Sequence, residues 1–292
     1  MFYARIIVLT SLAMTAFAGN SLLCRAALIH TSIDAASFTT IRLISGAVVL
    51  WLVVQIRHGT TAGAGNWLSA GVLFVYAAGF SFAYISLPAA TGALLLFAAV
   101  QATMIGYGFW AGERLRKPQL LGLILAFGGL IGLLLPGLST PPLYGSVLML
   151  GAGVAWGIYS LRGKGLGDPT KITTGNFLRA VPITLVMSLF MLKDLSLDTI
   201  GFCYAVASGT LASGIGYAIW YTALSALKAT NAATIQLSVP IIAAFGGVIM
   251  LGEPITLRLA LASLAILGGI ALVILEKPYA NSAQKIAPRD RT

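Results

Sequence analysis

Apolar residues occupy most of this chain in long runs, which are separated by short segments that contain glycine, proline or charged residues. A helix needs about 20 mostly apolar residues to cross a hydrocarbon core of roughly 30 Å. Ten runs meet this requirement and predict ten transmembrane helices, at residues 6–27, 35–56, 68–87, 91–111, 118–136, 143–162, 174–192, 200–224, 231–251 and 257–275. The short connections around Pro88 and from Pro136 to Pro142 predict antiparallel neighbours.

The composition indicates an all-α integral membrane protein. Of the 292 residues, 58% are hydrophobic and 9% are charged, whereas a soluble domain carries about 25% charged residues. Lipid is therefore the expected surrounding of most of the chain. Cys24 and Cys203 lie far apart in apolar runs, without the spacing of a metal site or a disulfide framework. We expect neither a metal nor another cofactor.

The positions of the basic residues predict the orientation. With the N-terminus in the cytoplasm, thirteen Lys and Arg residues fall on the cytoplasmic side, and three fall on the other, namely Arg25, Lys193 and Arg258. Cytoplasmic loops carry such an excess, so both termini are predicted to be cytoplasmic in a cell (inner) membrane. The formal charge of +10 is spread over loops rather than gathered in a patch, and so it does not indicate a nucleic-acid partner.

The N-terminus permits an alternative interpretation. Arg5, the apolar run that follows it and Ala16-Phe17-Ala18 resemble a cleavable secretory signal. Cleavage would leave nine spans and break the internal repeat. We therefore retain residues 6–27 as the first helix.

The chain contains an internal repeat. Gly112-Glu113-Arg114-Leu115 is followed 140 residues later by Gly252-Glu253-Pro254-Ile255, and each Glu precedes a Gly pair in the next helix, Gly128-Gly129 or Gly268-Gly269. Further matched segments are Gly92-Ala93-Leu94-Leu95 with Ala232-Ala233-Thr234-Ile235, Phe17-Ala18-Gly19 with Ala155-Trp156-Gly157, and Ile41-Arg42 with Leu178-Arg179. We predict five-helix repeats at 1–138 and 139–276, followed by a polar cytoplasmic tail at 277–292.

An odd number of spans per repeat predicts that the second repeat is inverted relative to the first. The loop after Glu113 carries three basic residues, whereas the equivalent loop after Glu253 carries only Arg258, as inversion requires. Inverted repeats are a common transporter architecture, in which the substrate site lies near the bilayer midplane between the halves. The pattern therefore predicts alternating access between two pseudo-symmetric halves.

The chain resembles the ten-helix EamA-type branch of the drug/metabolite transporter superfamily. The residues that carry the resemblance are the Ala155-Trp156-Gly157 step, the two Gly-Glu steps with their glycine-rich helices, and Pro240 in the ninth span. The resemblance covers about residues 6–275 and implies transport of amino acids, other metabolites or drugs. The first repeat departs from the pattern, because Phe17 stands where a Trp is usual and Val100 or Gln101 stands opposite Pro240.

Two charged residues, Arg42 and Arg179, lie clearly within the predicted spans rather than at their ends. An intramembrane charge is costly and usually faces a cavity or a partner. One or both arginines would then line the pathway and bind a substrate carboxylate. The alternative is that each lies near a helix end and extends to the lipid head groups.

Glu113 and Glu253 end the fourth and ninth spans. They are either gating carboxylates or residues that cap or orient the next helix, whose N-terminus favours an anion. We favour the capping role. Pro240 is expected to interrupt helical hydrogen bonding in the ninth span.

Polar and aromatic residues within the spans are the remaining candidates for the substrate pathway. Each of them is equally explained by helix packing or interfacial anchoring. They are Asn20, Tyr84, Gln101, Trp156, Tyr159, Asn176, Tyr217, Trp220, Tyr221 and Gln236.

These features favour a secondary transporter of a small amphipathic metabolite, with uniport or exchange and export favoured over uptake. None of the eight acidic residues falls in the middle of a predicted span, so a proton relay through a buried carboxylate is not indicated. A phosphate-binding loop of the GxxxxGK[ST] type is absent from the sequence.

A channel-like facilitator is the alternative to a transporter. A lipid-modifying enzyme is less favoured, because acids, bases or metal ligands do not gather at one face. The expected partners are a small-molecule substrate and membrane lipid, and the sequence does not fix an oligomeric state.

Overall fold

The structure is a computed structural model that describes residues 2–58, 64–110, 112, 117–137, 140–163, 167–224, 227 and 235–275. These residues are helical or lie in short connections, and no strand occurs among them. Eight helices are long and apolar enough to cross a membrane, and two shorter apolar helices cover Trp67–Ala83 and Ser238–Leu251. The expectation of an all-α, multi-pass membrane protein is confirmed. The polar tail predicted at 277–292 lies outside the described residues.

The helices follow the predicted spans closely. Up to residue 137 they are α1 (Phe2–His30), α2 (Ala35–His58), α3 (Trp67–Ala83), α4 (Ala89–Trp110) and α5 (Lys117–Leu134). Beyond residue 140 they are α6 (Leu143–Gly163), α7 (Pro169–Phe190), a short 3₁₀ turn η1 (Leu192–Asp194), α8 (Thr199–Ala207), η2 (Ser208–Ile215), α9 (Gly216–Leu224), α11 (Ser238–Leu251) and α12 (Leu257–Leu275).

Several helices begin at side chains that accept hydrogen bonds from the first helical turn. Asn66, Asp168 and Asp198 precede α3, α7 and α8, and each accepts from a backbone N–H two or three residues further along. Such caps satisfy donors that have no partner within the helix. Pro169 follows Asp168 and suits the first position of α7, where no N–H is needed.

Two of the predicted spans are not regular α-helices. The eighth, 200–224, contains the π-helical segment η2 between α8 and α9. π-helical turns are rare and occur frequently at functional positions. The ninth is interrupted at Leu237, and α11 begins one residue later with Pro240 in its first turn. Proline is tolerated there because the first helical N–H groups have no partner within the helix.

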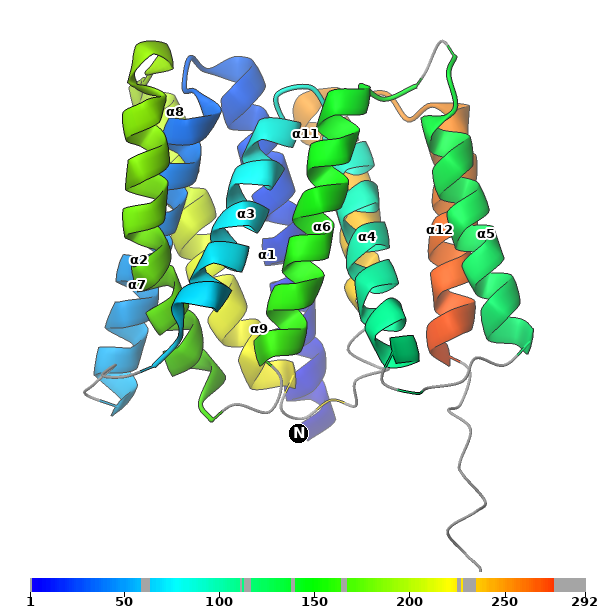
Figure 1. Cartoon of the computed structure of the whole chain (residues 1–292), viewed down its shortest axis with the longest axis horizontal. Coiled ribbons are helices and arrows are strands. Elements are labelled where there is room, and N and C mark those ends of the chain that lie inside the picture. The colour runs from blue at the N-terminus through cyan, green and yellow to red at the C-terminus, as the bar shows by residue number, and fades with distance from the viewer. Residues whose placement is uncertain are drawn as a thin grey trace, which may run out of the picture.

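The helices stand side by side in one bundle (Figure 1). The pair α5 and α12 forms one edge and the pair α2 and α7 the other, while α1, α3, α4, α6, α9 and α11 lie between them. The bundle end at which α1 begins is called the N-terminal end below. At this end α6 and α9 also end and α7 begins, whereas α4 begins and α11 ends at the opposite end.

Small residues allow close approach between helices. A Cβ at Gly153 of α6 would meet the backbone carbonyl of Leu96 and the Cβ of Ala99, both on α4, and a Cβ at Gly269 of α12 would meet the backbone of α5. Hydroxyl groups also join helices, since the Thr40 hydroxyl of α2 lies 2.8 Å from that of Thr184 in α7. Membrane helices commonly associate through small residues and interhelical hydrogen bonds.

Candidate functional site

A small central cavity lies between the middle helices. Its walls are mainly aromatic. The Trp156 ring of α6 is 4.8 Å from the Tyr76 ring of α3 and 5.0 Å from the Tyr217 ring of α9, measured between centroids. The lining residues are Phe17, Asn20, Tyr76, Phe80, Leu96, Phe97, Trp156, Ala212 and Tyr217.

Asn20 supplies a polar position in this cavity and is held by two other elements. Its Oδ1 accepts a 2.6 Å hydrogen bond from the Ser208 hydroxyl, and its Nδ2 donates to the Tyr76 hydroxyl over 3.4 Å. Ser208 is the first residue of the π-helical segment η2. The irregular turn of the eighth span therefore directs a hydroxyl toward α1, and this bond fixes the orientation of the Asn20 amide.

Arg42 is a buried cation beside the cavity. Its side chain is 1% exposed, and its Nε and Nη1 nitrogens have no hydrogen-bond partner among the described residues. The guanidinium carbon lies 4.9 Å from the Phe80 centroid and 5.4 Å from the Tyr76 centroid, and both rings line the cavity. A desolvated cation–π contact is worth about 2 kcal/mol, whereas burying an unpaired charge costs several kcal/mol. Within the described part of the chain, the free-energy cost of burying the Arg42 charge is thus only partly offset.

Gln101 of α4 is a second incompletely bonded polar side chain. It is 1% exposed, and its Nε2 has no hydrogen-bond partner in the part of the chain that the structure describes. It follows Phe97, which lines the cavity, by four residues. Residues four apart share one face of a helix, so Gln101 continues the cavity-facing side of α4 toward the N-terminal end.

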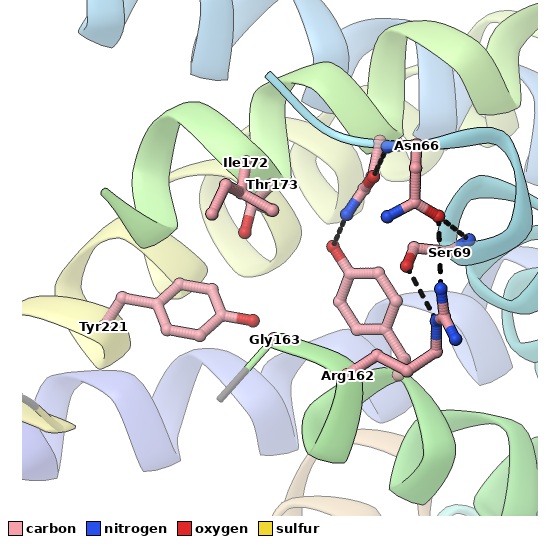
Figure 2. Close-up of a pocket in the computed structure, with 9 residues that line it drawn as sticks. Asn66, Ser69, Arg162, Gly163, Ile172, Thr173 and Tyr221 are labelled. Atoms are coloured by element: carbon pink, nitrogen blue, oxygen red, sulfur yellow. Dashed lines mark hydrogen bonds between the residues drawn. The ribbon is translucent and has the colours of Figure 1, made fainter. Parts of the chain in front are cut away.

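A second, small polar pocket lies at the N-terminal end, and Figure 2 shows it in close-up. We call it the vestibule. The Arg162 Nε donates to the Ser69 hydroxyl over 3.0 Å, and its Nη2 lies 3.4 Å from the Asn66 Oδ1. The lining residues are Asn66, Ser69, Tyr159, Arg162, Gly163, Ile172, Thr173, Asn176 and Tyr221.

Of the residues singled out in the sequence, six therefore line one of the two cavities, and Arg42 and Gln101 lie beside the central one. The six are Asn20, Trp156 and Tyr217 in the central cavity and Tyr159, Asn176 and Tyr221 in the vestibule. Trp220 packs on Phe17 with ring centroids 6.0 Å apart, and buried Gln236 lines neither cavity.

Arg179 and Tyr84 also lie away from both cavities. The Arg179 Nη1 donates to the carbonyls of Ala64 (2.5 Å) and Gly175 (2.9 Å), which ties α7 to the segment before α3. The Tyr84 hydroxyl donates to the Ala89 carbonyl over 3.4 Å and so closes the turn between α3 and α4. These contacts favour structural roles.

Glu253 does bind a helix N-terminus, but it is that of α4 rather than that of the following helix. Its Oε2 accepts from the Ala89 backbone N–H over 2.7 Å, and its Oε1 forms a 3.0 Å salt bridge with the Arg25 Nε. The Arg25 Nη1 also donates to the carbonyls of Tyr84 and Ile85. We call this group the outer clasp. Glu113 lies outside the described residues.

Several site residues escaped sequence reasoning. Tyr76 and Phe80 are four residues apart on α3, a spacing that puts them on one helix face, but the same spacing is typical of an ordinary packed face. Ser69 and Arg162 were not predicted as site residues, because their contact exists only where the ends of α3 and α6 are adjacent. The Arg25–Glu253 pair joins residues 228 positions apart, and no local pattern indicates it.

Comparison with known proteins assigns the class. The EamA-like transporter family matches residues 143–275. The threonine/homoserine exporter RhtA of Salmonella typhimurium is 33% identical over 175 residues, which are 56% of this chain and 58% of RhtA. The chain belongs to the EamA-like transporter family, within the drug/metabolite transporter superfamily, as the resemblance implied.

Further relatives extend the similarity along the chain. An uncharacterized protein of Pseudomonas aeruginosa, PA1977, is 55% identical over 92% of this chain and 94% of its own length. An uncharacterized transporter of Bacillus subtilis, YoaV, is 23% identical over 80% of this chain and 85% of its own length. A crystal structure aligns over 91% of this chain and 98% of its own with a TM-score of 0.64 and 19% identity, which shows the fold alone. The protein is a membrane transporter.

Proposed function

We propose that this transporter is an exporter or exchanger of small, amino-acid-like metabolites, which moves them by alternating access and binds the substrate carboxylate at Arg42. The proposal places the protein in the inner membrane with both termini in the cytoplasm. In this proposal the chain forms ten spans, which are arranged as two inverted repeats, 1–138 and 139–276.

The packing of the helices supports the inverted repeat. Numbering the spans in chain order makes α2 and α7, α4 and α11, and α5 and α12 equivalent pairs, and the members of each pair pack together. The contact of α3 with α6 is matched by that of α1 with η2 and α9, and the contact of α4 with α6 by that of α1 with α11. A two-fold relation between the halves accounts for this pattern, and such halves can rock about a shared site.

The unpaired guanidinium of Arg42 is the observation that carries the substrate class. A carboxylate matches the planar fork of N–H donors geometrically as well as electrically. The Nε and Nη1 of Arg42 are free to form such a pair. Aromatic walls suit the apolar part of a small metabolite, and the Asn20 amide supplies a further hydrogen-bonding group. The exporter direction is supported by the relatives that are named as threonine/homoserine exporters.

Counterflow in proteoliposomes tests this function. We expect saturable exchange of radiolabelled L-threonine or L-homoserine, and at least a tenfold weaker competition by the corresponding amides, which lack the carboxylate. A tenfold loss equals about 1.4 kcal/mol, less than a charged hydrogen bond contributes. Arg42→Ala should abolish the distinction between acid and amide.

Arg179→Ala serves as the matched control, because Arg179 has its own carbonyl partners outside the cavities. It should retain the preference for the acid. Equal competition by acid and amide in the wild type would contradict the carboxylate site. Flux that does not saturate and shows no counterflow would indicate a channel-like facilitator instead.

A further inference from the structure

The vestibule is built from the ends of four elements and is held in place by its own hydrogen bonds. The Asn66 backbone N–H donates to the Asn176 Oδ1 over 2.9 Å, and the Asn176 Nδ2 donates to the Tyr159 hydroxyl over 3.2 Å. The Asn66 side chain also caps α3 by accepting a hydrogen bond from the Ser69 backbone N–H. The Ser69 hydroxyl in turn accepts a hydrogen bond from the Arg162 Nε. Figure 2 shows the Arg162 guanidinium reaching Asn66 and Ser69 across the pocket from Tyr221. The guanidinium is therefore fixed rather than free to swing out of the pocket.

The vestibule carries a positive charge. Arg162 donates to a hydroxyl and to an amide oxygen, both of them neutral. Among the residues that the structure describes, no acid lines the pocket, and the salt bridge Arg25–Glu253 lies at the opposite end of the bundle. A guanidinium has five N–H groups, and these two contacts leave others for a ligand. The pocket thus favours an oxyanion.

Along α6 and α9, the vestibule follows the central cavity toward the N-terminal end of the bundle. Trp156 and Tyr217 line the central cavity, and Tyr159 and Tyr221 line the vestibule, three and four residues further along α6 and α9. Residues at these spacings share one helix face. The Trp156 and Tyr159 rings are stacked, with centroids 5.6 Å apart and planes inclined by 24°. One ring of this stacked pair lines each cavity, and we call the pair the partition.

We propose that the vestibule is a second, anion-selective site, in which Arg162 holds the carboxylate of the solute before the solute passes the Trp156–Tyr159 partition toward Arg42. The identity of that anion as the transported solute rests on the proposed function; the anion selectivity of the pocket does not. Two guanidinium groups, one in each cavity, then present the same recognition chemistry at successive positions on the path.

A cysteine at Gly163 tests the selectivity without transport. A Cβ at this position has only the Tyr221 hydroxyl within reach, at 4.0 Å, so a thiol fits. Gly163→Cys is made with Cys203→Ser, because Cys203 is exposed and Cys24 is buried. The solubilised protein is labelled with a sulfonate-bearing and with a trimethylammonium-bearing methanethiosulfonate. We expect Arg162→Gln to lower the ratio of the two rates, sulfonate over ammonium, at least about tenfold, since removing a nearby unit charge changes the rates in opposite directions.

Controls separate the pocket from general surface charge. Arg57→Gln removes an exposed cation at the end of α2 and should leave the ratio unchanged. An unchanged ratio in Arg162→Gln would overturn the proposal.

Protection from labelling identifies the source of the anion. L-homoserine should slow sulfonate labelling of Gly163→Cys in phosphatidylcholine nanodiscs, and homoserine amide should not. Protection only by phosphatidylglycerol would assign the pocket to a lipid phosphate and overturn the role in solute entry. If L-homoserine protects Gly163→Cys while Arg42→Ala transports normally, the proposed central site is wrong and the vestibule site is retained. If Arg42→Ala abolishes transport but L-homoserine gives no protection, the vestibule site is wrong and the central site is retained.

Discussion

Arg42 illustrates how a single residue can combine a structural cost with a functional role. Its guanidinium is enclosed by aromatic rings and has two unpaired nitrogens. Replacing a buried ion pair by apolar side chains of similar volume is often neutral or stabilising, by about 1–4 kcal/mol, and a buried charge without a counter-ion has still less to offset its desolvation. A buried cation retained without a partner is therefore best explained by a ligand that supplies the missing anion.

Arg42→Met is accordingly expected to raise the melting temperature of the detergent-solubilised protein while lowering exchange at least tenfold. The substitution removes the unpaired charge and keeps most of the volume. Differential scanning fluorimetry and counterflow measure the two effects.

Arg179→Met should behave in the opposite way. Its guanidinium bonds the carbonyls of Ala64 and Gly175, so its loss is expected to destabilise the fold by about 1–3 kcal/mol. A fall in melting temperature for Arg42→Met would argue that Arg42 is a structural residue.

At the scale of helices, the two Gly pairs of the repeat divide into packed and open positions. A Cβ at Gly129 would lie 2.8 Å from the Ala265 Cβ of α12, and one at Gly269 would meet the backbone of α5, whereas Gly128 and Gly268 have nothing within 4 Å. The sequence pattern marked both members of each pair as small. Only the contact between α5 and α12 shows which member of each pair must be glycine for the two helices to pack closely.

Gly269→Val should therefore destabilise the protein by about 1–3 kcal/mol, the usual cost of inserting volume into a packed contact. Gly268→Val is the matched control and should change stability by less than about 0.5 kcal/mol, as substitutions away from packed features do. Thermal unfolding followed by fluorescence compares the two. Equal losses would show that helix propensity, rather than the α5–α12 contact, sets the effect.

At the scale of the whole molecule, the outer clasp joins α1, the start of α4 and the end of α11. Glu253 follows Gly252, whose φ of +64° lies in the left-handed region that favours glycine. This turn allows the carboxylate to meet both Arg25 and the Ala89 N–H. If the halves rock, opening the cavity toward this end requires these contacts to separate.

Glu253→Gln should therefore favour opening at the end opposite the N-terminus. In Ala212→Cys combined with Cys203→Ser, which removes the exposed cysteine, the new thiol would line the central cavity. We expect Glu253→Gln to speed its labelling by an impermeant reagent about tenfold. This corresponds to about 1.4 kcal/mol, slightly less than a hydrogen bond to a charged group contributes. Arg258→Gln, which removes bonds to Leu135 and Thr140 at the same end, should leave the rate unchanged. A slower rate in Glu253→Gln would exclude the clasp as a closing contact.

Much of the fold followed from the sequence because lipid imposes a simple rule, namely that a spanning segment must be apolar and must satisfy its own backbone hydrogen bonds. Helices such as α2 and α6 accordingly begin and end within two residues of the predicted spans. The exceptions arose where local geometry overrides hydropathy. Tyr84 closes a turn that ends α3 early, and the π-helical turn at Ser208 leaves no apolar signature.

The sequence by itself determined the class of protein and its apolar helices, and it offered Arg42, Trp156 and Tyr217 as candidates, because apolar runs, intramembrane charges and family motifs are local properties of the chain. The tertiary structure decided which candidates share a cavity. It separated Arg42 from Arg179, paired Glu253 with Arg25, and placed Arg162 in the vestibule. These outcomes depend on which helix faces meet. Since lipid and a neighbouring helix are equally apolar, hydropathy does not distinguish the face that packs from the face that is exposed.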